Sequence, residues 1–140
     1  MMRVVIDTNV LVAGIRSSRG ASARLISLIR AEKFEFAVSL ALYLEYLDVL
    51  TRAENLALGQ TVEDAIDFVE KIVSLSHKLR VNFPWRPMLP DPDDDFVLEL
   101  AIAAGSRYIV TFNKRDFRGA DLFGIELVTP AEFLEIIKKQ

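Results

Sequence analysis

The sequence contains no cysteine and only one histidine, His77. Without cysteine there are no disulfides, no zinc fingers or iron–sulfur clusters held by thiolates, and no cysteine nucleophile. A single histidine argues against a site built from several imidazoles, and we expect His77 to lie exposed at a helix end, without a function. These absences leave oxygen atoms as the ligands from which a metal site would be built.

Long hydrophobic runs are missing as well. No apolar stretch approaches the roughly 20 residues that cross a bilayer, and the first residues lack the apolar segment and cleavage site of a secretory signal. Glycine-rich phosphate loops of the Walker or Rossmann type are also absent. We therefore expect a cytoplasmic protein that does not associate with membranes. The 140 residues, 51% of them hydrophobic, suit a single domain spanning 1–140.

Basic residues are not in excess, and the formal net charge at pH 7 is −3. Proteins that bind nucleic acids normally meet the phosphate backbone with an excess of Lys and Arg. If four acidic residues are committed to metal, however, the charge of the remainder is −3 + 4, or +1. The net charge therefore does not exclude a nucleic-acid partner.

Hydrophobic patterning predicts strands that alternate with helices. Short apolar runs are typical of parallel strands covered on both faces, whereas apolar residues three or four positions apart indicate helices. The predicted strands are 3–6, 34–39, 79–81, 108–111 and 125–128. Helices are predicted at 8–15, from a capping Ser22, over 40–50, from Thr61, over 96–104 and from Pro130. This order predicts a three-layer α/β/α sandwich around a mostly parallel sheet of four or five strands.

Several helix ends carry recognisable signals. Thr61 and Asp64 match a capping box, and so do Thr129 and Glu132. Gly105 is expected to cap the C-terminus of the helix over 96–104. Three prolines within 82–90 predict an extended connector between that helix and the preceding strand.

Four carboxylates are predicted to meet at one edge of the sheet. Asp7 ends the first strand, Asp116 follows the strand that ends at Thr111, and Asp95 starts the helix that leads into that strand. Glu45 lies on the helix over 40–50. Carboxyl ends of parallel strands converge, and such a cluster repels itself unless a cation neutralises it. Oxygen ligands select Mg²⁺ or Mn²⁺, which can activate water and stabilise a phosphoryl group.

Each of these carboxylates also has a simpler interpretation. Asp7 can be a helix N-cap, Glu45 a solvated helix residue, and Asp116 a turn residue. Several aspartates before the helix over 96–104 could supply the carboxylate expected there, and the helix phase favours Asp95 among them. Asn113 lies on the same loop as Asp116, but it is neutral, so the charge favours Asp116. The aspartates before the helix are Asp91, Asp93, Asp94 and Asp95.

The candidate acidic residues lie in three sequence segments and one helix that follow one another along the chain. The segment 6–11, IDTNVL, joins a hydrophobic strand to an aspartate, a hydroxyl residue and an asparagine. An aspartate leads an alanine-containing helix at 95–101, and a strand with an acidic loop follows at 108–117. Glu45 lies on the helix between the first two segments. Running in order from Met2 to about Glu132, these segments and the helix resemble the PIN-domain nucleases over nearly the whole chain.

The resemblance implies a metal-dependent nuclease that cleaves single-stranded RNA, with Mg²⁺ or Mn²⁺ as cofactor. The metal-site and catalytic carboxylates would be Asp7, Glu45, Asp95 and Asp116. Many compact members similar to this chain are toxins of the VapC type, each silenced by a small antitoxin protein, whereas other PIN domains serve in RNA processing or decay. Around the metal site, four residues are expected to orient the ligands or water. They are Thr8, Asn9, Thr111 and Asn113.

Basic residues near the acidic positions are candidates for phosphate contacts. Arg16, Arg19 and Arg24 surround the loop after the first helix, and Lys114 and Arg115 adjoin Asp116. The apolar surfaces of the helices over 40–50 and 65–75 suit a homodimer. A rival interpretation is a non-catalytic, Mg²⁺-binding regulatory domain of the receiver type, but the lysine it would need at a late strand end is replaced by Val110 and Thr111.

Overall fold

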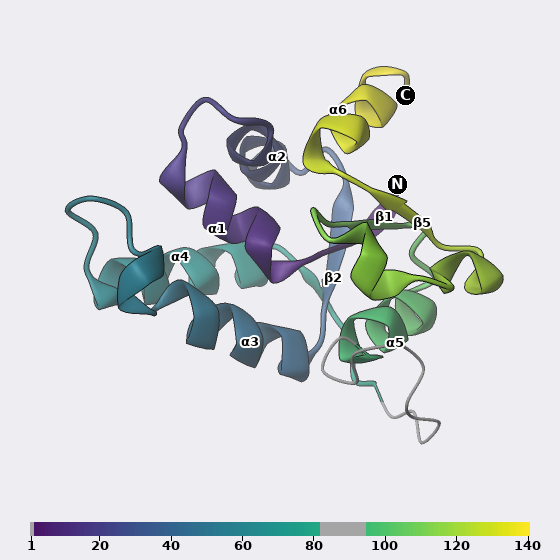
Figure 1. Ribbon diagram of the computed structural model, residues 1–140, viewed down its shortest axis with the longest axis horizontal. Helices are drawn as coiled ribbons and strands as arrows, with labels where there is room; N and C mark the ends of the chain where they lie inside the picture. Colours follow the sequence, from purple (N-terminus) through teal and green to yellow (C-terminus); the bar gives the residue numbers. More distant parts are fainter. Residues whose placement is uncertain (1, 82–94) are drawn as a thin grey trace.

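A five-stranded parallel sheet forms the centre of the molecule (Figure 1). The computed structural model describes residues 2–81 and 95–140. The strands are β1 (Arg3–Ile6), β2 (Glu35–Val38), β3 (His77–Lys78), β4 (Tyr108–Val110) and β5 (Glu126–Val128). Their order is β3-β2-β1-β4-β5, and every pairing is parallel. The predicted α/β fold with a parallel sheet is therefore confirmed.

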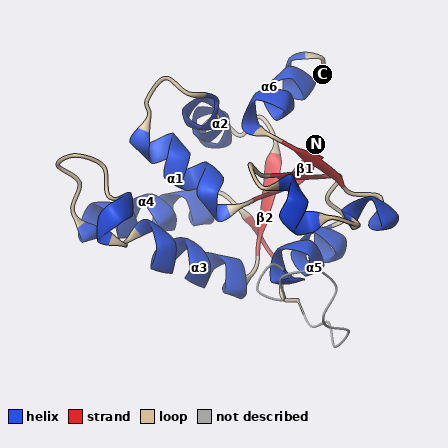
Figure 2. Cartoon of the chain, viewed as in Figure 1, coloured by secondary structure: helices blue, strands red, loops and turns tan. Residues whose placement is uncertain are grey.

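Helices cover the sheet on both sides (Figures 1 and 2). They are α1 (Thr8–Arg16), α2 (Ala21–Arg30), α3 (Leu40–Leu50), α4 (Val62–Ser74), α5 (Asp95–Ala104) and α6 (Pro130–Lys138). Helix α5 packs against β1, β2 and β4, while α1 contacts α2 and α3, and α2 contacts α6. Right-handed crossovers place α5 on the opposite side of the sheet from α1 and α2. No helix among the described residues is long and apolar enough to cross a membrane.

The core lies between the central strands and these helices. Val4, Val5 and Ile6 of β1 are fully buried, as expected for a central strand covered on both faces. On α3 the buried side chains are Leu42 and Tyr46 together with Leu50, which lie four positions apart. The chain therefore presents Tyr46, rather than its neighbour Glu45, to the core.

The predicted helix ends agree with the structure at three places. Thr61 and Asp64 form a reciprocal capping box at the start of α4, and Thr129 and Glu132 form another at the start of α6. Gly105 follows α5 with a φ of +63°, in the left-handed region that glycine adopts without strain. Local side-chain chemistry decided these ends, so the sequence alone was sufficient.

Two local predictions are wrong. Ser22 does not cap α2, because the helix begins earlier: Gly20 is the N-cap, and its carbonyl accepts the Arg24 N–H at 3.2 Å. The third strand is His77–Lys78 rather than 79–81, because β2 pairs only as far as Val38 and the chain then enters α3. His77 is consequently an exposed residue of a strand, not of a helix end. The predicted connector 82–90 lies outside the described residues.

Candidate metal centre

Asp7 lies at the carboxyl end of β1, where it also forms the N-cap of α1. Its Oδ1 accepts a hydrogen bond from the backbone N–H of Thr8 at 3.0 Å, and its Oδ2 accepts one from the Thr111 hydroxyl at 2.8 Å. The residue is only 9% exposed. The N-cap interpretation is therefore correct, but it accounts for one carboxylate oxygen only. The other oxygen is held by a residue that follows β4.

Glu45 reaches the same turn from α3. Its Oε2 accepts a short hydrogen bond from the hydroxyl of Thr8, the first residue of α1. Thr8 therefore bridges two carboxylates, since its backbone N–H binds Asp7 and its hydroxyl binds Glu45. The predicted convergence of Asp7 and Glu45 rests on this single buried threonine.

Asp116 approaches from the far side of β1, on the 3-10 helix η3 (Lys114–Phe117) that follows β4. Its backbone N–H donates to the Asn113 carbonyl at 3.0 Å, and the fully buried ring of Phe117 anchors the turn. The Asn113 backbone N–H in turn donates to the Thr111 hydroxyl at 2.9 Å. The hydroxyl that binds Asp7 thus also orients the loop that carries Asp116.

The electrostatics of these groups oppose ionisation. Burial raises the pKa of Asp7; the hydrogen bonds from Thr111 and Thr8 lower it, and the charge of Asp116 raises it. Burial likewise raises the pKa of Glu45, while the Thr8 hydroxyl lowers it and the charge of Asp7 raises it. The two carboxylates are therefore costly to ionise together, which is the condition that a bound cation relieves.

The donor set suits a hard divalent cation in kind, because its atoms are carboxylate oxygens and the sequence has no cysteine and a single histidine, the exposed His77. The number of ligands is too small. Among the described residues, no group of three His, Cys, Asp or Glu side chains could hold a metal ion. Asp95 begins α5 as predicted. Its side chain, like the rest of the acidic run 91–94, lies outside the described residues.

The comparisons with known proteins bear on the family and the fold of this chain. The PIN domain family matches residues 3–115, which includes β1 to β4 and the first two residues of η3. This chain is a member of the PIN domain family. No protein with a curated description matches it. A solved structure described as "A domain of a functionally unknown protein from Methanocaldococcus jannaschii DSM 2661" is similar in fold, with a TM-score of 0.52 and 16% identity over 92% of this chain and 91% of that one.

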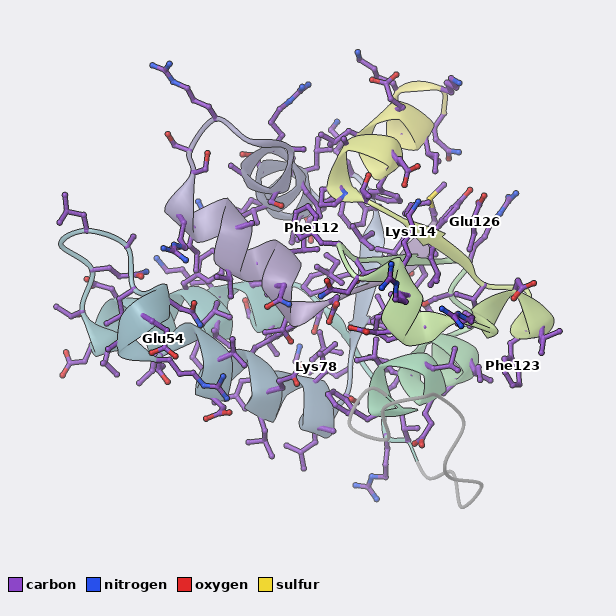
Figure 3. All side chains as sticks on the ribbon, viewed as in Figure 1. Glu54, Lys78, Phe112, Lys114, Phe123 and Glu126 are labelled. Carbon is purple, nitrogen blue, oxygen red and sulfur yellow. The ribbon has the colours of Figure 1, made fainter. Side chains whose placement is uncertain are left out.

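The residues expected to orient the ligands of this PIN domain behave differently from one another. Thr8 and Thr111 are buried, and each donates its hydroxyl to a carboxylate. Asn9 is exposed on α1. Asn113 contributes its backbone N–H to Thr111, and its side chain is exposed. Figure 3 labels Phe112 and Lys114, the residues before and after it in the sequence.

The basic residues lie at different distances from the carboxylates. Arg16 ends α1, so a nine-residue helix with a rise of roughly 13 Å separates it from Asp7. Arg19 and Arg24 follow on the next turn and on α2, and all three side chains are exposed. Any contact that they make with a substrate is therefore remote from the carboxylates.

Lys114 and Arg115 are closer to the carboxylates, on η3. Lys114 forms an ion pair with Glu132 of α6 at 2.7 Å, and Glu132 also accepts the Thr129 N–H in the capping box. Within the described part of the chain, Arg115 makes no such pair. Arg115 is therefore the freer of the two cations.

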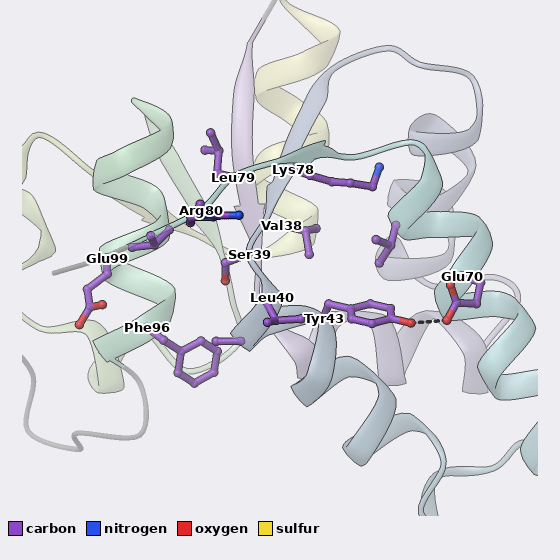
Figure 4. A pocket seen from close by; sticks show the side chains of 13 residues that line it. Val38, Ser39, Leu40, Tyr43, Glu70, Lys78, Leu79, Arg80, Phe96 and Glu99 are labelled. Atoms are coloured by element: carbon purple, nitrogen blue, oxygen red, sulfur yellow. Dashed lines mark hydrogen bonds between the residues drawn. The ribbon is translucent and has the colours of Figure 1, made fainter.

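A hollow of about 720 Å³ opens elsewhere, beside the start of α3 and α5 (Figure 4). Its lining includes Leu40, Phe96 and the buried Glu99. On its other side the hydroxyl of Tyr43 donates a short hydrogen bond to Glu70 of α4. Asp7 and Glu45 are not among the lining residues, so the hollow is separate from the carboxylate pair.

Proposed function

We propose that this PIN domain is a Mg²⁺- or Mn²⁺-dependent endoribonuclease that hydrolyses phosphodiester bonds in single-stranded RNA. The single observation that carries the proposal is the carboxylate pair Asp7 and Glu45, joined through Thr8 at the carboxyl edge of the sheet. Two acids held together against their own repulsion favour a cation-binding role over a purely structural one.

Four residues would hold the ion: Asp7, Glu45, Asp95 and Asp116. A divalent cation bound there supplies a water of lowered pKa and stabilises charge on the phosphoryl oxygens. Two of these carboxylates differ in how firmly the protein holds them. Asp7 is fixed by two hydrogen bonds, whereas the half-exposed Asp116 sits on a short turn and can adjust to the ion or the substrate.

The chain's own residues supply orientation and protonation control. The Thr111 and Thr8 hydroxyls donate to Asp7 and Glu45, so the remaining lone pairs of each carboxylate are directed away from these donors. Hydrogen bonds to the charged form also counteract the burial that raises the pKa of Asp7. The site therefore stays ionised more readily than burial alone would allow.

For the substrate, we infer that an extended RNA strand passes the carboxylates and contacts basic groups on both sides. Arg115 and Lys114 flank the site on η3, and Arg16, Arg19 and Arg24 lie beyond the far end of α1. Phosphate contacts of this kind position a strand without selecting its sequence. The separation of the two basic groups favours an extended strand over a single mononucleotide.

We also propose that the protein is the toxin of a toxin–antitoxin pair and works as a homodimer. The resemblance to compact VapC-type toxins supports the toxin role, and exposed apolar residues support self-association. On α3 and α4 these are Leu40, Leu44, Val62 and Ile66. Induction of the protein in cells should arrest growth. If a neighbouring gene encodes a small antitoxin, its co-expression should relieve the arrest. Continued growth on induction would instead favour a role in RNA processing or decay.

The enzymatic proposal is tested by incubating purified protein with a labelled, unstructured RNA oligonucleotide. Cleavage in Mn²⁺ or Mg²⁺ that stops in EDTA supports it. Binding of Mn²⁺ without any cleavage would point to the non-catalytic, metal-binding alternative.

A further inference from the structure

Tyr46 is a fully buried polar side chain next to the carboxylate pair. It follows Glu45 on α3, is 0% exposed, and donates its hydroxyl to the Ile6 carbonyl at 2.6 Å. Ile6 immediately precedes Asp7. Two neighbouring residues of α3 therefore contact the turn that carries Asp7, one on each side of it.

The group that Tyr46 holds is the peptide unit joining Ile6 to Asp7. In a planar peptide the carbonyl of one residue and the N–H of the next belong to one rigid body. The N–H end of this unit, on Asp7, donates to the Val110 carbonyl of β4 at 2.9 Å. With Tyr46 on the carbonyl end, the plane of the peptide is held from two different elements.

The sheet does not supply the partner that Tyr46 provides. On this side of β1, the Met2 carbonyl accepts the Glu35 N–H of β2 at 2.8 Å. Along β1, every second carbonyl faces β2, and the Ile6 carbonyl is one of these. The backbone of the neighbouring chain that would pair with it lies beyond Val38, the last residue of β2. Without the tyrosine hydroxyl, this buried carbonyl would lose its protein partner just before Asp7.

Glu45 is tied to the same turn by a second hydrogen bond. The Thr8 hydroxyl donates to its carboxylate, while Tyr46 binds Ile6, so the tethered residues lie on either side of Asp7. Like charges on Asp7 and Glu45 favour a wider separation. The two tethers oppose that separation, and the one from Tyr46 is shielded from water.

We propose that Tyr46 is a positioning residue of the carboxylate site: by holding the Ile6–Asp7 peptide, its hydroxyl sets the spacing between Asp7 and Glu45 and so the affinity for a divalent cation. The inference rests on the proposed function. The packing of α3 requires only the aromatic ring of Tyr46. The other buried positions of this helix are Leu42 and Leu50, whose side chains carry no polar atom. The hydroxyl is needed only for the carbonyl.

The test compares Tyr46→Phe with Tyr43→Phe, a matched control on the same helix. Tyr43 also donates its hydroxyl to an acceptor, but that acceptor is Glu70 at the separate hollow (Figure 4). Calorimetric titration with Mn²⁺ should give a Kd about 10-fold higher in Tyr46→Phe, the scale for losing a group that orients a metal ligand. Tyr43→Phe should match the unsubstituted protein. The KM for RNA should stay within about twofold in both, since neither hydroxyl is proposed to touch the substrate.

A merely structural role for Tyr46 makes a different prediction. It would lower the melting temperature in EDTA but leave the Mn²⁺ Kd of the folded protein unchanged, and that result would overturn the proposal. If Tyr46 acts through the spacing of the pair, the double variant Glu45→Gln/Tyr46→Phe should bind Mn²⁺ within about twofold of Glu45→Gln alone. Additive losses would contradict the mechanism.

Amide hydrogen exchange in the unsubstituted protein gives an answer even if Tyr46→Phe fails to fold. In EDTA, the Asp7 amide should exchange as slowly as the amide of Val5 within β1, because the peptide is held before any metal binds. Fast exchange that slows only on adding Mg²⁺ would overturn the proposal. Failure of the nuclease function appears separately, as Mn²⁺ binding without RNA cleavage by the unsubstituted protein.

Discussion

The hydroxyl of Thr111 lies 2.8 Å from Oδ2 of Asp7 and joins the ends of β4 and β1 across 104 positions of the chain. Both residues are buried, with Thr111 fully so. The contact depends on the pairing of Ile6 with Val110, which brings the ends of the two strands level. The proposed site is thus a product of strand register, and changes to this hydrogen bond should affect metal binding directly.

Thr111→Val removes the hydroxyl while keeping the shape of the side chain. Because this hydrogen bond lowers the pKa of Asp7, its loss should raise that pKa further. We expect Mn²⁺ affinity to fall about 10-fold and the acid limb of the activity profile to move to higher pH. Thr51→Val at the end of α3, whose hydroxyl binds the Leu47 carbonyl, is the control and should change neither quantity. Equal pH profiles of activity for the two variants would mean that Thr111 does not act on the metal site.

Asp7→Asn should have opposite effects on stability with and without metal. Burial raises the pKa of Asp7 in the folded, metal-free protein, so the folded state binds the proton more tightly than the unfolded state. The associated stability is present at low pH and is lost as the pH rises from about the ordinary value of 3.8 through the raised pKa. Near neutral pH in EDTA, the ionised Asp7 is therefore destabilising, and Asp7→Asn should melt at a higher temperature.

This difference should shrink as the pH falls through 3.8, because Asp7 becomes protonated in both states below that pH. Mn²⁺ should reverse the order, because the ion binds only the native state and stabilises the protein that retains the carboxylate. Each 1 kcal/mol corresponds to roughly 3–5 °C in a chain of this size. A Mn²⁺-induced rise of equal size in both proteins would mean that the ion binds elsewhere.

Asp116 and Asn113 are distinguished by substitution on the same loop. Asp116→Asn removes a charge that acts on Asp7, and activity should fall by about 10-fold or more. Asn113→Ala leaves intact the backbone N–H that binds Thr111, so it should have a much smaller effect. Steady-state cleavage of one RNA oligonucleotide measures both. The reverse order of effects would assign the fourth position to Asn113.

Lys114 and Arg115 should contribute unequally to RNA binding. Lys114 is paired with Glu132, whereas Arg115 has no ion pair within residues 2–81 and 95–140. Arg115→Gln should therefore weaken RNA binding more than Lys114→Gln, and it should reduce the slope of log K against log salt by about 1. Fluorescence anisotropy at several salt concentrations, in an Asp7→Asn background that prevents cleavage, gives both quantities. A larger loss for Lys114→Gln would mean that the Glu132 pair opens on RNA.

Features set by neighbouring residues were predictable from the sequence. The capping box of Thr61 with Asp64 needs only a few adjacent side chains, and β1 is recognisable from its continuous apolar run. The start of α2 was not predictable, because the helix begins after Gly20, which has no side chain to signal a cap, and Ser22 lies inside the helix. The bounds of β3 depend on where its partner β2 ends, which lies 40 positions away in the register Val38 to Lys78.

The candidate site shows the same division. Asp7 and Glu45 were identified because the chemistry and order of their segments resemble one family, and the structure brings them together through Thr8. Tyr46 was missed. Its four-residue spacing from Leu42 and Leu50 indicates burial, but the carbonyl it binds belongs to Ile6, 40 positions away. A contact of that kind depends on tertiary packing, which local patterns do not contain.

A metal-dependent nuclease centred on Asp7 is best tested by the single-turnover rate of RNA cleavage by Asp7→Asn in saturating Mn²⁺. The substitution keeps the size of the side chain and removes the charge proposed to hold the ion. Asp67→Asn, on the exposed face of α4, is the matched control and should cleave at the unsubstituted rate. We expect a rate at least about 10²-fold lower for Asp7→Asn, and no cleavage by the unsubstituted protein in EDTA. Cleavage that continues unchanged in Asp7→Asn would contradict this expectation.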